Sequence, residues 1–166
     1  MLTNIDGTNV YYEIAGKGKP VLLLHGWGVD MSSFSPLIDF LQKDYKVIAF
    51  DFPGFGKSDP PKTTWDVGNY SAFLASFINQ TGLARTDIIA HSFGARVAIK
   101  LAVEQPDMIN KLILVNGAGI KPRRTFKYHF KTFLAKTVKI ASKMLGNPDN
   151  KLKEKIYHYI GSSDFQ

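Results

Sequence analysis

The residue best suited to act as a nucleophile is Ser92, in the run AHSFGA at positions 90–95. An apolar run at 88–90 precedes it and apolar residues at helical spacing follow it, so we expect Ser92 in a turn between a strand and a helix. Such a turn strains the nucleophile's backbone and requires small residues two positions away, where strand and helix come close. Ala90 and Gly94 meet this requirement. The sequence therefore predicts a serine hydroxyl at a helix N-terminus, where free amides favour negative charge.

Two alternatives bear on this turn. Serine is a favoured helix N-cap, so Ser92 could simply cap the helix that follows it. His91 is adjacent to Ser92, but neighbouring residues point to different sides of a strained turn. We therefore interpret His91 as a packing residue that borders the site and not as the catalytic base.

A second loop supplies the groups that acyl transfer needs besides a nucleophile. The first core strand ends in LHGWG at 24–28, where the glycines let the backbone fold over a neighbouring site. An oxyanion requires two or more donors, and we assign them to the backbone amides of Trp27 and Phe93. His25, Gly26, Trp27 and His91 are expected to border the substrate. The loop DFPGFGKSD at 51–59 matches neither GxGxxG nor GxxxxGK[ST], so it is interpreted as a structural turn beside the site.

The elements that must position these loops alternate along the chain. Asp6-Gly7 before the alternating residues 9–14 predicts a hairpin. Short apolar runs predict strands buried on both faces, at 21–24, 47–50, 88–90 and 112–115. Helical patterns separate them, at 33–42, from Tyr70 to Ile78, and from Phe93 to Glu104. The predicted fold is α/β, with a doubly wound, mostly parallel sheet whose ligands bind beyond the carboxyl ends of the strands.

Composition limits the function classes. Residues 1–121 hold 11 Lys/Arg and 11 Asp/Glu, whereas residues 122–166 hold 10 basic and 3 acidic residues, so the net charge of +7 comes from the second segment. This shift predicts a domain boundary, with a core at 1–121 and a second segment at 122–166. The absence of cysteine excludes thiolate catalysis and zinc–thiolate sites. The first residues show no secretory leader, and we expect a cytoplasmic enzyme.

HGWG, DFPGFGKSD, AHSFGA and LILVNGAG, in this order on successive strands, resemble the α/β-hydrolase superfamily, particularly its esterase, lipase and C–C hydrolase branches. The resemblance covers residues 1–121 and implies a serine, an acid and a histidine in that chain order. Serine at position 92 argues against the dehalogenase and epoxide-hydrolase branches, which use aspartate there. We therefore predict a serine hydrolase that cleaves a carboxylic ester or a related acyl or C–C bond in a small molecule, without metal or cofactor. The alternative is a non-catalytic protein of the same fold that binds a small apolar ligand.

The resemblance also predicts what residues 1–166 lack. Only His129 and His158 follow Ser92, and both fall where the family inserts a cap, not where its catalytic histidine lies. The loop after the strand at 112–115 reads Asn116-Gly117-Ala118-Gly119 and holds no carboxylate. We expect an incomplete fold, inactive by itself, that associates with a missing C-terminal part or a second chain.

The segment 122–166 carries an amphipathic pattern. Apolar residues near helical spacing oppose lysines at 127, 131, 139 and 143. The predicted element is a helical cap or lid over the site. A helix at a membrane surface is the less favoured alternative, and we expect no nucleic-acid partner because no groove-reading motif accompanies the charge.

Overall fold

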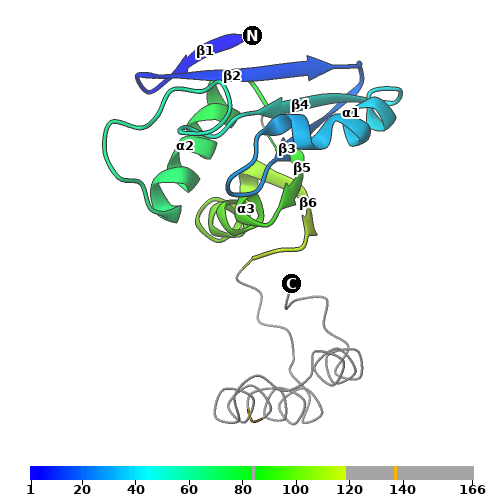
Figure 1. Cartoon of the computed structure of the whole chain (residues 1–166). Coiled ribbons are helices and arrows are strands. Elements are labelled where there is room, and N and C mark those ends of the chain that lie inside the picture. Colours follow the sequence, from blue (N-terminus) through cyan, green and yellow to red (C-terminus); the bar gives the residue numbers. More distant parts are fainter. Residues whose placement is uncertain (84, 119–136, 138–166) are drawn as a thin grey trace, which may run out of the picture. The chain divides into compact units, whose positions relative to one another are not determined.

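The computed structural model describes residues 1–83, 85–118 and 137. The elements below belong to the compact unit Met1–Ile120. The predicted cap segment, 122–166, lies outside the described residues apart from Thr137. Within the described unit, a sheet with the strand order β1-β2-β4-β3-β5-β6 carries the loops of interest (Figure 1).

The sheet opens with a hairpin of β1 (Leu2–Ile5) and β2 (Thr8–Ala15). Asp6 and Gly7 both have positive φ, 48° and 83°, as a two-residue turn that matches the twist of its strands requires. β2 then pairs antiparallel with β4 (Tyr45–Phe50). The predicted hairpin is confirmed, and it forms the antiparallel edge of the sheet.

The remaining pairs are parallel. β3 (Lys19–Leu24) lies between β4 and β5 (Thr86–His91), and β6 (Ile109–Val115) pairs with β5. Residues 21–24 of β3 are 0–5% exposed, because helices cover both faces of this central strand. The carboxyl ends of β3, β4 and β5 therefore meet at one edge of the sheet, as predicted.

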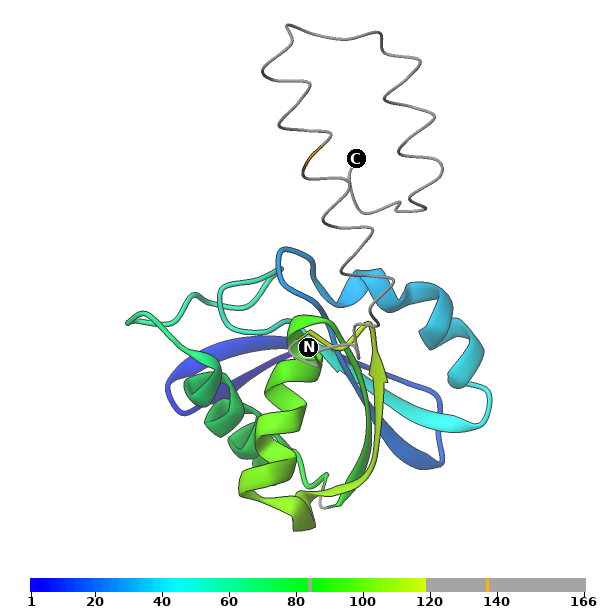
Figure 2. The ribbon, with the colours of Figure 1, turned by 90° about the horizontal axis from the view of Figure 1, so that it is seen from below.

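Helices lie on both sides of the sheet (Figure 2). α2 (Val67–Gln80) and α3 (Phe93–Glu104) cover one face over a large core that contains Phe50, Phe77 and Leu101. A 3₁₀ turn (Met31–Phe34) and α1 (Ser35–Leu41) cover the other face over a smaller core. One predicted helix at 33–42 is thus two elements, with the 3₁₀ turn capped by the Asp30 carboxylate, which accepts from the Ser32 amide.

The prediction that every parallel strand is buried on both faces is wrong for β6. Leu112 and Leu114 pack against the large core, but Ile113 and Val115 are 54% and 42% exposed. Alternate side chains of a strand point to opposite faces. The smaller core beneath α1 reaches β3, β4 and Ile89 of β5, so α1 does not cover β6.

Candidate functional site

Ser92 occupies the turn between β5 and α3 with a backbone that side chains rarely adopt. Its φ and ψ are 47° and −103°, a conformation that costs a non-glycine residue about 1–3 kcal/mol. Three backbone hydrogen bonds hold it: the Ser92 amide donates to the Val115 carbonyl at 3.0 Å, and the Ser92 carbonyl accepts from the amides of Arg96 and Ala118, each at 3.3 Å. The strained turn is therefore anchored to both α3 and the loop after β6.

The small residues around Ser92 sit where the sequence requires them. A Cβ added to Gly94 would lie 2.5 Å from the Leu24 carbonyl oxygen, and the Gly94 amide donates to the His25 carbonyl at 3.1 Å. A Cβ added to Gly26 would lie 2.9 Å from His91 Nδ1 and 3.5 Å from Ser92 Cβ. The start of α3 thus packs directly on the loop after β3, and any larger side chain at either glycine would push the two apart.

The hydroxyl of Ser92 makes no helix-capping hydrogen bond, so the capping alternative lacks its defining contact. In the described part of the chain, no hydrogen bond is formed by this hydroxyl or by the amides of Trp27 and Phe93. Backbone amides in folded proteins are nearly always paired. Unpaired amides on the two loops beside Ser92 are therefore suited to bind an external acceptor.

The other sequence-predicted residues differ in accessibility. Trp27 is 65% exposed, whereas His25 is fully buried. His25 Nδ1 lies 2.8 Å from the Gly26 carbonyl oxygen, and the Phe52 amide donates to His25 Nε2 at 2.9 Å. Both ring nitrogens are thus engaged by the backbone, an arrangement that suits support of the loops after β3 and β4 and not the substrate contact predicted for His25. His91 is half-buried at the end of β5, next to Gly26.

Burial also sets the protonation state of His25. It lowers the pKa of His25 below 6.5, and outweighs the Gly26 hydrogen bond and the charge of Asp51, which both raise it. A carbonyl only accepts and an amide only donates, so neutral His25 carries its proton on Nδ1. The ring therefore acts as a neutral bridge between two loops.

The loop after β4 is built around Asp51, which is 2% exposed. Its carboxylate accepts from the amides of Met31 and Lys57, each at 2.9 Å, and its carbonyl accepts from the Ser58 hydroxyl at 2.6 Å. Gly56 has a φ of 52° and approaches the Asp51 carboxylate too closely for any Cβ. These contacts agree with the predicted structural turn.

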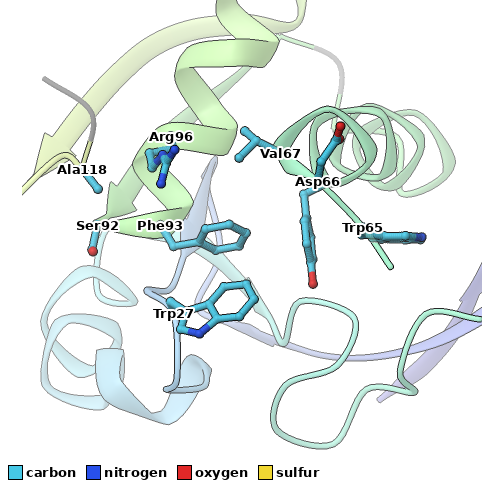
Figure 3. Close-up of a pocket in the computed structure, with 9 residues that line it drawn as sticks. Trp27, Trp65, Asp66, Val67, Ser92, Phe93, Arg96 and Ala118 are labelled. Atoms are coloured by element: carbon cyan, nitrogen blue, oxygen red, sulfur yellow. The ribbon is translucent and has the colours of Figure 1, made fainter. Parts of the chain in front are cut away.

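A cavity of about 370 Å³ opens beside Ser92 (Figure 3). Four aromatic side chains form a continuous wall of edge-to-face contacts: Trp27 with Phe93 at 5.1 Å, Phe93 with Tyr70 at 5.0 Å, and Tyr70 with Trp65 at 5.1 Å between ring centroids. Burial raises the pKa of Tyr70, whose hydroxyl donates to the Pro53 carbonyl at 3.2 Å. The wall is therefore mostly apolar, and the Tyr70 hydroxyl is bonded to the backbone.

Of the predicted site residues, Trp27, Ser92 and Phe93 line this cavity, and His25, Gly26 and His91 do not. Sequence reasoning missed six lining residues: Trp65, Asp66, Val67, Tyr70, Arg96 and Ala118. Two signals were available. Arg96 lies four residues after Ser92 on the predicted helix, and Trp65-Asp66 stands where a helix N-cap is expected before Tyr70.

Three further features concern the downstream histidines, metal-binding groups and membrane-spanning helices. His129 and His158, the two histidines after Ser92, lie outside the described residues. Among the residues that are described, no group of three or more His, Asp or Glu side chains could hold a metal ion. No helix within the same residues is long and apolar enough to cross a membrane.

Comparison with known proteins adds independent evidence. Residues 19–149 match the sequence model of a family described as alpha/beta hydrolase fold. The chain is 34% identical over 117 residues to the dihydrolipoyllysine-residue acetyltransferase component of the acetoin cleaving system of Cupriavidus necator, a match to 70% of this chain and 31% of that protein. It is 35% identical over 120 residues to a non-heme chloroperoxidase of Streptomyces lividans, covering 70% of this chain and 44% of that one.

A solved structure has a similar fold. The crystal structure of a membrane phospholipase A, described as a bacterial virulence factor, matches with a TM-score of 0.71 and 28% identity over 78% of this chain and 43% of that one. The chain thus spans less than half the length of each of these three proteins.

Proposed function

The chain belongs to the α/β-hydrolase fold family, and from this premise we propose that it carries the nucleophile and oxyanion site of a serine hydrolase. The reaction is cleavage of a carboxylic ester or a related acyl or C–C bond in a small molecule. One observation carries the proposal: a strained serine whose hydroxyl forms no hydrogen bond lies beside the amides of Trp27 and Phe93, which are unpaired in the described part of the chain.

The proposed chemistry follows from these groups. Ser92 Oγ attacks the carbonyl carbon, and the carbonyl π electrons move to its oxygen, which accepts hydrogen bonds from the Trp27 and Phe93 amides. A base outside the described residues takes the hydroxyl proton and passes it to the leaving group as the tetrahedral intermediate collapses. Water then releases the acyl group from Ser92. The cavity beside the serine accommodates the apolar part of the substrate against its aromatic wall.

Labelling of the serine tests this proposal. A fluorophosphonate probe should modify Ser92 in the full-length protein, because such probes react with serines that a base activates. Ser92→Ala should abolish the modification, whereas Ser33→Ala, which removes an exposed hydroxyl on the opposite face of the sheet, should leave it unchanged. Peptide mass spectrometry identifies the modified residue. Labelling that survives Ser92→Ala would refute the assignment.

A second candidate function is binding without catalysis. It is favoured by the Ser92 hydroxyl, which forms no hydrogen bond with either of the two histidines within the described ranges, and by the aromatic wall beside it. Turnover of p-nitrophenyl esters by the full-length protein separates the two functions. Ligand binding in the cavity without any Ser92-dependent turnover would favour the binding protein.

A further inference from the structure

Arg96 places a positive charge in the cavity that holds Ser92. It lies in the first turn of α3, and its amide donates to the Ser92 carbonyl at 3.3 Å. Its side chain is exposed and lines the cavity, together with Ser92 from the turn before α3, Phe93 from α3 and Val67 from the start of α2 (Figure 3). Arg96 and Ser92 line the same cavity of about 370 Å³, so the guanidinium can reach a group a few bonds from a carbonyl held at Ser92.

No described residue neutralises this charge. The ion pairs of the described ranges join Lys19 to Asp87 and Lys100 to Glu104, and the Arg96 guanidinium forms no hydrogen bond with any described group. Asp66 lines the same cavity, but its carboxylate accepts from the Asn69 amide at 3.0 Å and caps α2. The five donors of Arg96 are therefore available to a ligand.

The groups around the Arg96 guanidinium favour strong hydrogen bonds with a charged ligand. Most of the other lining groups are apolar, and four of them are the rings of the aromatic wall. Hydrogen bonds between charged groups are stronger where water is partly excluded. A guanidinium matches the two oxygens of a carboxylate with two parallel hydrogen bonds.

We propose that Arg96 is a specificity-determining residue that binds a carboxylate on the substrate. The preferred substrate class is then an ester with a carboxylate a few bonds from the scissile carbonyl and an apolar or aromatic part against Trp27 and Phe93. Where it concerns turnover, this inference rests on the proposed function of Ser92. Where it concerns binding, it rests on the cavity alone. A monoanion fits better than a dianion, because Asp66 shares the cavity and repels additional negative charge.

The sequence offers a direct probe of binding. It contains 2 tryptophans, and both Trp27 and Trp65 line the cavity, so intrinsic fluorescence reports occupancy without turnover. We expect 4-phenylbutyrate to bind about fivefold more tightly than the neutral 4-phenylbutyramide, as for a partly exposed ion pair. The ratio should decrease at high ionic strength.

Matched variants test whether Arg96 is the cation that binds the carboxylate. Arg96→Gln should reduce the ratio of the two affinities to about one, and Arg96→Lys should retain part of it. Lys100→Gln removes the same charge one turn further along α3, outside the cavity lining, and should retain the full ratio. Equal affinities in the unmodified protein, a ratio that survives Arg96→Gln, or an equal loss in Lys100→Gln would overturn the proposal.

The binding test of Arg96 and the labelling test of Ser92 can fail independently of each other. Ser92→Ala should keep the preference for the carboxylate, because binding does not require the nucleophile. A preference for the carboxylate in a protein whose Ser92 resists the fluorophosphonate would support the role of Arg96 and refute the serine hydrolase. Labelled Ser92 with no such preference would refute the role of Arg96 alone.

Discussion

Two polar side chains stand directly after parallel strands at the same edge of the sheet, Asp51 after β4 and Ser92 after β5. Asp51 is 2% exposed, and both carboxylate oxygens accept backbone amides. Ser92 is anchored through its backbone and lines the cavity, while its hydroxyl has no described partner. Position at the strand ends is common to both. The two side chains differ in that the Asp51 carboxylate is bonded within the protein, whereas the Ser92 hydroxyl bonds to no described group.

The two loops also place backbone strain differently. In the loop after β4, positive φ falls on Gly54 and Gly56, which adopt it without cost. In the turn after β5 it falls on Ser92, with φ 47°. A glycine at position 92 would relieve the strain but would remove the hydroxyl. The two loops therefore differ in whether a glycine or a residue with a side chain adopts positive φ, and Ser92 shares this feature with Asp6, Arg85 and Asn116.

The largest expected effect concerns the unpaired amide of the loop after β3. Trp27→Pro removes the amide donor, so kcat of the full-length protein on a small ester should fall about 10²-fold or more. Trp27→Phe keeps the amide and an aromatic ring, and should retain most of kcat. Equal rates for the two variants would show that Trp27 is not an oxyanion donor.

A smaller effect is expected at the saturated side chain. Asp51→Asn replaces one acceptor oxygen with an NH₂ group that faces a backbone amide, which should lower the free energy of unfolding by about 2 kcal/mol. Ser92→Ala should change it by less than about 1 kcal/mol, because the hydroxyl bonds to no described group. Urea unfolding of the two variants measures both values. A larger loss for Ser92→Ala than for Asp51→Asn would reverse the assignment of structural and reactive roles.

The smallest expected effect involves His25, which bridges the two loops. Burial lowers the pKa of folded His25 below its ordinary value of 6.5. As the pH falls below about 6.5, His25 takes up a proton in the unfolded chain but not in the folded chain. The contribution of neutral His25 to the free energy of unfolding is therefore fully present above about pH 6.5. It decreases as the pH falls from about 6.5 to the lowered pKa of the folded state. Urea unfolding between pH 5 and 8 should show this decline, and His25→Gln should show a shallower one. Identical slopes would indicate that His25 is not buried in its neutral form.

Much of the architecture was predictable because it depends on local chemistry. Asp6-Gly7 predicted the hairpin through its tolerance of positive φ, and the apolar runs predicted the strands at the centre of the sheet. The prediction failed at β6, where Ile113 and Val115 are as apolar as buried residues but lie on a face that α1 does not reach. A pattern of apolar residues predicts a strand, and the length and position of other elements decide what covers it.

The sequence by itself determined the order of the strand-end loops, the serine in its small-residue turn, and the glycines at positions 26 and 94 that allow close approach. These depend on residue type and spacing over a few positions. Only the tertiary structure decided that His25 is a buried bridge, that Asp51 is saturated while Ser92 is free, and that Arg96 and Trp65 share one cavity with the serine. The physical reason is that hydrogen-bond saturation and cavity lining are set by residues far apart in the chain, whose meeting depends on how helices and strands pack.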